Sequence, residues 1–540
     1  MGAMRLLSRY RLIFILAVGL LCAALLLNEH LVPAGDNATY IVLGQSLATG
    51  RGYRMVSDPR QPEMALYPPG YPLLLAGVLA ALQGGATHSL MAAVIPMKWV
   101  SVALYLAAIA LVYALFWQRN ATLATLAALL TALNPHILYY AAEVGTEMPY
   151  LLLSLGCVWL FERYWRKPTT GALLWTAGWL AVAFYVRSVA LVMAAAFVLY
   201  LVVRRRLKHA LLLLLLVGIL AAPWFIRSSL LPATGTSVGL GRGYFALYSS
   251  SDPYGTARAS LPSLVARLAQ NLRMYALEIW PGLLLPHVSE VGVLLPALDL
   301  VLSGLMSLLL VVGWAVEARR GSASEWYVAL FFLSCVGYLW VQGRLIVPII
   351  PFAIYYLLSA LDWLLTRALR ERNKAHSLGI AVTCAALALS ALAVDMRSIQ
   401  RNLRFGLGKS VATYYSKQDA DWRNYQKAVD WIVRDAQPLA ALKTMGPVVV
   451  MCRKADLTYI LTGFQALEYP YSTDGQQLMR AVRDNHVSYL IEDRFFWTYT
   501  TAEYMRPALQ AWRDADPGAV SLAYELDRPP TRVWRVNQTE

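Results

Sequence analysis

A succession of long apolar runs constrains this chain more than any other feature, and these runs stop near residue 394. Hydrophobic residues fill 58% of the 540 positions and charged residues only 15%, a balance that does not suit a surface exposed to water on all sides. A membrane-spanning helix needs about 20 predominantly apolar residues. The sequence therefore predicts a polytopic α-helical membrane protein that ends in an aqueous region.

The first apolar run, residues 12–27, follows three arginines, and no small-residue cleavage site precedes Asn28. We interpret it as an uncleaved first span whose N-terminus is cytoplasmic. Further apolar runs bring the predicted total to eleven transmembrane helices. These ten further spans are expected at residues 97–116, 121–138, 148–161, 171–186, 188–203, 210–226, 296–316, 325–341, 345–365 and 377–394.

Basic residues alternate along the predicted topology. Residues 1–394 carry 28 Lys and Arg against 15 Asp and Glu, whereas residues 395–540 carry 19 against 17. The turns placed inside by odd-even alternation are basic, as the positive-inside rule requires. They contain Arg119, Arg163, Arg166, Lys167, Arg204, Arg205, Arg206, Lys208, Arg319, Arg320, Arg367, Arg370, Arg372 and Lys374. With no nucleic-acid-binding motif in the chain, this excess indicates topology and contact with membrane lipids rather than DNA or RNA.

The same alternation places all the aqueous mass on the external face. We expect a transmembrane domain over residues 1–394 with external loops at 28–96 and 227–295, and an extracytoplasmic α/β domain over residues 395–540. In that domain the pattern predicts strands at 447–452 and 487–492 and helices at 422–434 and 476–483. Its one cysteine, Cys452, has no neighbour with which to form a disulfide framework or metal pair.

Asp36 stands within ten residues of the end of the first span. The apolar residues that follow, up to Gly50, have helical spacing, which predicts an amphipathic helix at the membrane interface. An aspartate before a helix commonly serves as its N-cap. A carboxylate held beside apolar groups at a bilayer surface can also act as a general base, because such surroundings raise its pKa. The two roles are compatible.

Two further external segments carry candidate site residues. Tyr67 and Tyr71 lie in a Pro-rich stretch that predicts a rigid, extended path, and they could form the wall of a cavity. Glu143 and Glu147 precede Pro149, which makes Glu147 a boundary residue of the next helix. They are either part of a hydrophilic turn or acids that bind a divalent ion or position an acceptor.

Three arginines occupy the side that the positive-inside rule disfavours. Arg187 and Arg344 lie in short turns between apolar runs, and Arg227 follows Pro223 and Trp224. Such arginines either extend to phospholipid headgroups or bind an anion. The fixed fork of guanidinium donors suits a phosphate.

Taken together, these segments resemble the GT-C superfamily of membrane glycosyltransferases, which includes protein O-mannosyltransferases and lipid A aminoarabinose transferases. The resemblance rests on the order of five stretches: Gly35-Asp36 with the helix to Gly50, Tyr67-Pro68-Pro69-Gly70-Tyr71-Pro72, Thr146-Glu147, Pro223-Trp224-Phe225-Ile226-Arg227 and Gly343-Arg344-Leu345. It implies that Asp36 is the catalytic acid of the first external loop and that Glu147 replaces a second acid, which is Asp in many relatives.

The resemblance also implies a donor sugar on a polyprenyl phosphate and inversion at the anomeric carbon. Arg187 and Arg344, with Arg227, would then bind the donor phosphate, and Tyr67, Tyr71 and Glu143 would line the substrate cavity. The acceptor, whether lipid, glycan or protein, and the need for a divalent cation stay open. A bacterial inner-membrane location is expected.

Two other classes of protein compete with a transferase. A transporter or lipid flippase also needs many spans and buried charge, but transporters place ionisable groups near the membrane midplane. A non-catalytic assembly or receptor protein would work through residues 395–540, and it would leave Arg187 and Arg344 unexplained.

Overall fold

The computed structural model describes residues 2–82, 90–231, 248–250, 258–286, 296–369, 374–441, 447–495, 499–528 and 530–537. Its contacts group the chain into two compact units. The helical unit comprises Met1–Leu27, Lys98–Leu230 and Gly243–Leu403, and the loop–sheet unit comprises Asn28–Met97, Leu231–Arg242 and Arg404–Glu540. The predicted end of the transmembrane domain at residue 394 stays a prediction. In the structure, the first loop belongs to the same compact unit as the C-terminal region.

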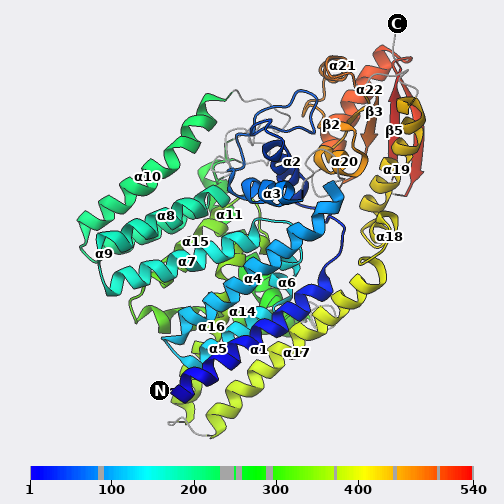
Figure 1. The fold of residues 1–540 in the computed structure, drawn as a ribbon. Helices are drawn as coiled ribbons and strands as arrows, with labels where there is room; N and C mark the ends of the chain where they lie inside the picture. Colours follow the sequence, from blue (N-terminus) through cyan, green and yellow to red (C-terminus); the bar gives the residue numbers. More distant parts are fainter. Residues whose placement is uncertain are drawn as a thin grey trace. The chain divides into compact units, whose positions relative to one another are not determined.

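The helical unit is built of long helices that run side by side (Figure 1). Their bounds are α1 Gly2–Leu26, α4 Val94–Trp117, α5 Ala121–Ala132, α6 Pro135–Ala141, α7 Glu147–Arg166, α8 Thr170–Val186, α9 Ala190–Val203, α10 Leu207–Leu230, α11 Leu261–Met274, α12 Trp280–Leu284, α14 Pro296–Ala318, α15 Ala323–Gly337, α16 Ile350–Leu369 and α17 Lys374–Phe405. A π-helical turn, η4 Tyr275–Ile279, joins α11 to α12, and a 3₁₀ helix, η5 Gly343–Ile349, precedes α16.

Within the described residues, six helical segments are long and apolar enough to cross a membrane, or seven if the bent pair α5–α6 forms one span. The six are Arg9–Leu26, Leu90–Trp117, Leu207–Leu230, Pro296–Ala318, Gly343–Leu369 and Lys374–Phe405. The chain is thus an integral membrane protein. The predicted spans at 171–186, 188–203 and 325–341 correspond to shorter apolar helices, and the span at 121–138 is broken by a bend of 59°. The total of eleven stays a prediction.

Buried polar contacts hold the helical unit together at helix ends. Asn402 of α17 donates to the carbonyls of Leu25 and Leu27, both at 2.9 Å, and so satisfies acceptors that the end of α1 leaves without a helical partner. Arg119, predicted only as a topology signal, lies within 2.8 Å of Glu162 and of Glu325. These contacts join the end of α4 to α7 and α15.

One glycine sets how closely two helices approach. A Cβ at Gly313 of α14 would lie 1.8 Å from the carbonyl oxygen of Tyr356 on α16. Only glycine allows this backbone contact, which is the small-residue packing typical of membrane helices.

The loop–sheet unit contains a five-stranded sheet of order β2-β1-β3-β5-β4. β1 pairs in parallel with β2 and β3, whereas β5 pairs antiparallel with β3 and β4. The strands are β1 Val449–Met451, β2 Gln465–Leu467, β3 Tyr489–Glu492, β4 Val520–Asp527 and β5 Pro530–Val536. The helices are α2 Asn37–Ala48, α3 Gly70–Ala81, η1 Leu90–Ala93, α18 Val411–Tyr415, α19 Ala420–Ala441, α20 Ala455–Thr462, α21 Gly475–Asp484, η6 Thr501–Met505 and α22 Arg506–Ala515.

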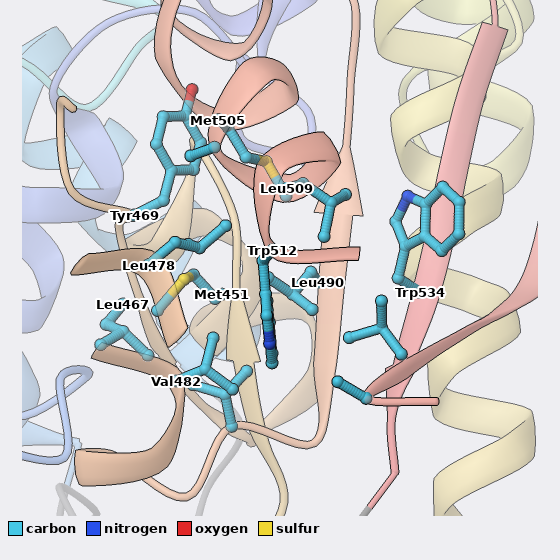
Figure 2. Packing of buried hydrophobic residues seen from close by; sticks show 14 of the residues in the cluster. Met451, Leu467, Tyr469, Leu478, Val482, Leu490, Met505, Leu509, Trp512 and Trp534 are labelled. Atoms are coloured by element: carbon cyan, nitrogen blue, oxygen red, sulfur yellow. The ribbon is translucent and has the colours of Figure 1, made fainter. Parts of the chain in front are cut away.

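The sheet carries a compact apolar core. Figure 2 shows Trp512 of α22 in one cluster with Met451 of β1 and Leu490 of β3. The predicted strands at 447–452 and 487–492 and the helices at 422–434 and 476–483 are confirmed as β1, β3, α19 and α21. The C-terminal region is therefore α/β, as predicted.

Two predictions about the first loop are wrong. The expected interfacial helix exists as α2, but Asn37, Ala38, Tyr40, Ile41, Val42, Leu43, Gly44 and Ser46 are all buried, so it is enclosed rather than amphipathic. A Cβ at Gly44 would lie 3.0 Å from Leu75 Cβ, because α3 packs directly on this helix. The Pro-rich stretch is not extended throughout: α3 begins at Gly70 and contains Pro72 in its first turn, where proline is tolerated.

Candidate functional site

In the helical unit, Glu147 meets two of the predicted arginines. Its Oε1 atom lies 3.4 Å from Nη1 of Arg187 and 3.6 Å from Nε of Arg344. The residue is 5% exposed, so these charges interact with little screening by water. Three residues that are far apart in the sequence thus form one cluster, which we call the Glu147 cluster.

Helix ends position the members of this cluster. Glu147 is the first residue of α7, and Pro149 in the same turn fixes the start of that helix. Arg187 is the C-cap of α8, where its backbone N–H donates to the carbonyl of Ala183 at 2.9 Å, and its guanidinium lies over the ring of Tyr150 at 5.8 Å. Arg344 lies in η5, immediately before α16.

His136 of α6 is a neighbour that the sequence analysis missed. A Cβ at Gly343 would lie 3.0 Å from the Cε1 and Nε2 atoms of its ring, which places the imidazole directly beside the turn that carries Arg344. The ring of Tyr140 lies edge-on to it at 5.0 Å. The sequence contains only a weak indication that His136 belongs to a site. Asn134-Pro135 is typical of a helix start, and a single His follows it inside an apolar run.

Glu143 has a different partner from Glu147. Its carboxylate lies 3.3 Å from Nζ of Lys98, whose side chain is fully buried. Burial raises the pKa of the Glu143 carboxyl, and the Lys98 charge opposes that rise. This ion pair joins α4 to the segment before α7, and Lys98 is a further residue that the sequence analysis did not identify.

Among the described residues, no three His, Cys, Asp or Glu side chains are grouped as metal ligands.

Arg227 lies in the last turn of α10, with its guanidinium 5.6 Å from the ring centroid of Trp224. Pro223 lies inside the same helix. The stretch from Pro223 to Arg227 is therefore helical, and α10 continues to Leu230, past the predicted end of the span at residue 226.

Asp36 belongs to the loop–sheet unit and occupies the N-cap position of α2. Its backbone carbonyl accepts from Tyr40 at 3.0 Å, but its carboxylate makes no capping hydrogen bond to the helix. The predicted N-cap position of Asp36 is therefore confirmed. The capping hydrogen bond expected from its side chain is not formed. Gly35 before it has φ 94°, a conformation that non-glycine residues rarely adopt.

The two predicted tyrosines lie around a third one. The Tyr40 ring of α2 is 5.1 Å from that of Tyr67 and 5.2 Å from that of Tyr71, both edge-to-face. Tyr71 is 2% exposed. The aromatic cluster fixes the Pro-rich stretch against α2, one turn from Asp36.

Comparison with known proteins identifies the fold. Residues 69–226 match the family model for dolichyl-phosphate-mannose-protein mannosyltransferase. The archaeal oligosaccharyltransferase AglB from Archaeoglobus fulgidus, solved with an inhibitory peptide and a dolichol-phosphate, aligns with a TM-score of 0.57 at 12% identity over 98% of this chain and 74% of that one. ArnT from Cupriavidus metallidurans bound to undecaprenyl phosphate aligns with a TM-score of 0.53 at 12% identity, over 97% of both chains.

This chain has the GT-C glycosyltransferase fold. The resemblance predicted from the sequence is thereby confirmed. The apo form of ArnT gives a TM-score of 0.54 at 14% identity, again over 97% of both chains, so the GT-C likeness includes the C-terminal α/β region. No curated protein matches the sequence.

Proposed function

We propose that this GT-C protein is an inverting glycosyltransferase that moves a hexosyl or pentosyl group from a polyprenyl-phosphate donor to a lipid, glycan or protein acceptor on the external membrane face. The observation that carries the proposal is the convergence of Arg187 and Arg344 on one carboxylate oxygen of Glu147. A pair of partly exposed guanidinium groups is suited to a phosphate, because their donors can still reach a ligand. The fold supports this, because solved proteins that share it contain dolichol-phosphate or undecaprenyl phosphate.

In the proposed reaction Asp36 is the general base. Its carboxylate takes the proton of the acceptor hydroxyl while the acceptor oxygen attacks the anomeric carbon, and the bond from that carbon to the phosphate oxygen breaks. Arg187 and Arg344, assisted by Arg227, stabilise the charge that develops on the leaving prenyl phosphate. We propose that Tyr67, Tyr71 and Glu143 contact the sugar of the donor.

Glu147 is proposed to balance part of the charge of the two arginines, which their helix ends hold in place for the phosphate. Two cations directly beside its carboxylate repel a metal ion, so the proposed reaction uses no divalent cation at this position. The position of the charges also favours a transferase over a transporter. Glu147, Arg187 and Arg344 lie at helix ends rather than in the middle of spanning segments, where transporters place ionisable groups.

We propose the membrane topology that the sequence predicts. Eleven spans would place the N-terminus in the cytoplasm and residues 395–540 outside a bacterial inner membrane. The donor lipid would enter from the bilayer, and the acceptor from the aqueous side.

Mass analysis of envelope glycoconjugates in a deletion strain tests this function. We expect one glycoconjugate to disappear and one polyprenyl-phosphate sugar to accumulate, and wild-type protein to reverse both changes. Asp36→Asn should fail to do so. Glu63→Gln is the matched control in the same loop, because its pair with Arg54 is a surface ion pair of little energetic value. Unchanged glycoconjugates in the deletion strain would contradict the proposal.

A further inference from the structure

Helix α20 of the C-terminal region contacts the first loop on both sides of Asp36. Nζ of Lys454 donates to the carbonyl of Gly35 at 3.1 Å. The Thr39 hydroxyl donates to Asp456 Oδ2 at 2.6 Å, and the Ser57 hydroxyl donates to Asp456 Oδ1 at 2.7 Å. Both carboxylate oxygens of Asp456 are thus occupied by the loop that carries the proposed base.

Two more bonds extend this contact. Tyr459, one turn after Asp456 on α20, donates to Gln45 Oε1 at 3.1 Å. The backbone N–H of Ala466 in β2 donates to the carbonyl of Ser57 at 2.8 Å. Because β2 is an edge strand, the loop occupies a donor that an edge would otherwise expose.

Lys454 also acts on Asp36 through its charge. Burial is the main cause that lowers the pKa of Lys454 to about 8, and the neighbouring Arg453 adds to it. The negative charges of Asp36, Glu468 and Asp456 oppose that shift. The Lys454 ammonium also lies 6.0 Å from the ring centroid of Trp422 on α19. A lysine in such surroundings changes its charge within a pH range in which enzymes are assayed.

We propose that Lys454 and Asp456 are positioning residues that fix the orientation and the charge of Asp36, an inference that rests on the proposed function. Asp36 is the N-cap of α2, so the backbone on both of its sides determines where its carboxylate is placed. Lys454 holds that backbone at Gly35, and Asp456 holds it at Thr39. The C-terminal region therefore takes part in catalysis through the first loop, without touching the substrate.

The charge of Lys454 predicts an alkaline limit to activity. Below pH about 8 the ammonium is protonated and favours the ionised Asp36 that a general base requires. As the pH rises through 8, Lys454 becomes neutral and this support is lost. An arginine at the same position stays charged, because the pKa of a guanidinium lies far above the pH range of the assay.

The experiment measures transfer against pH and amide exchange in the full-length protein. Detergent extracts of deletion-strain membranes supply donor and acceptor, and the missing glycoconjugate is quantified. Lys454→Met, Lys454→Arg and Asp456→Asn are compared with Lys427→Met and Asp484→Asn, which change exposed residues of α19 and α21. Thr39→Val removes the same hydrogen bond from the loop side if Asp456→Asn does not fold.

We expect the rate for Lys454→Met to fall roughly 10-fold at pH 7, as the loss of one charge-assisted hydrogen bond predicts. Lys454→Arg should restore most of the rate and move the alkaline limb upward by at least one pH unit. Amides of residues 37–40 should exchange faster in Lys454→Met, Asp456→Asn and Thr39→Val, and both controls should match wild type.

Two results would overturn the inference in different ways. An unchanged pH profile and unchanged exchange in Lys454→Met and Thr39→Val, with Asp36→Asn inactive, would refute the positioning role and leave the proposed function standing. Normal transfer by Asp36→Asn would refute the proposed function itself, and with it any catalytic meaning of the α20 contact.

Discussion

Replacing Glu147 by glutamine removes a negative charge from beside two guanidinium groups and keeps the shape of the side chain. Arg187 and Arg344 lie 3.4 Å and 3.6 Å from its Oε1 atom. A lipid phosphate bound on the far side of these groups would lie about 7 Å from the carboxylate, which corresponds to a repulsion of about 1–2 kcal/mol at an effective dielectric of about 20–40. Glu147→Gln should therefore bind undecaprenyl phosphate about 5- to 30-fold more tightly than wild type.

The assay is a titration of the purified full-length protein with undecaprenyl phosphate in detergent, followed by native mass spectrometry and repeated with EDTA. Arg187→Met and Arg344→Met should each weaken binding about 10- to 100-fold, because each removes charge-assisted hydrogen bonds of about 1.5–3 kcal/mol. Glu63→Gln should bind as wild type does. Weaker binding by Glu147→Gln, or loss of wild-type binding in EDTA, would refute the arginine-based account and favour a metal held by Glu147.

Two further predictions concern stability. Arg119→Met removes the cation that lies 2.8 Å from the buried carboxylate of Glu325 and 2.8 Å from the carboxylate of Glu162, and should lower the free energy of unfolding by about 3–5 kcal/mol, measured by thermal unfolding in detergent; a change below about 1 kcal/mol would contradict this. Burial raises the pKa of Asp456 to about 6 from 3.8, so the folded state holds this proton more tightly than the unfolded chain. Its contribution favours folding at acid pH and is lost as the pH rises through 6, by about 1–3 kcal/mol. The stability of wild type relative to Asp456→Asn should fall between pH 4 and pH 6, and a difference independent of pH would show that Asp456 titrates normally.

The positions of helices could be predicted well where burial in lipid decides the pattern. The first span and the run before residue 117 are found as α1 and α4 within a few residues at their apolar ends. The strands β1 and β3 are buried on both faces and were recognisable as apolar runs, whereas β4 and β5 alternate buried and exposed residues weakly and were missed.

The character of α2 could not be predicted because its partners are distant in sequence. Its polar residues Thr39 and Gln45 indicate a water-facing side, but Asp456 and Tyr459 occupy that side in the fold. The same reason explains the missed residues of the site. Lys98 and His136 each occur once within an apolar stretch, and only the tertiary structure places them beside Glu143 and Gly343. Arg187 and Arg344 were recognisable from the sequence as candidate phosphate ligands, because both are predicted to lie on the side of the membrane where basic residues are disfavoured. Their pairing with Glu147 is seen only in the fold.

The central claim is that Asp36 acts as the base of a transfer from a polyprenyl-phosphate donor. The most direct measurement is the rate at which purified Asp36→Asn restores the missing glycoconjugate in extracts of deletion-strain membranes, for protein whose binding of undecaprenyl phosphate equals that of wild type. We predict a rate about 10²- to 10⁴-fold lower than wild type, the usual contribution of a general base. A rate within about threefold of wild type would contradict the claim, since an amide cannot accept the acceptor proton.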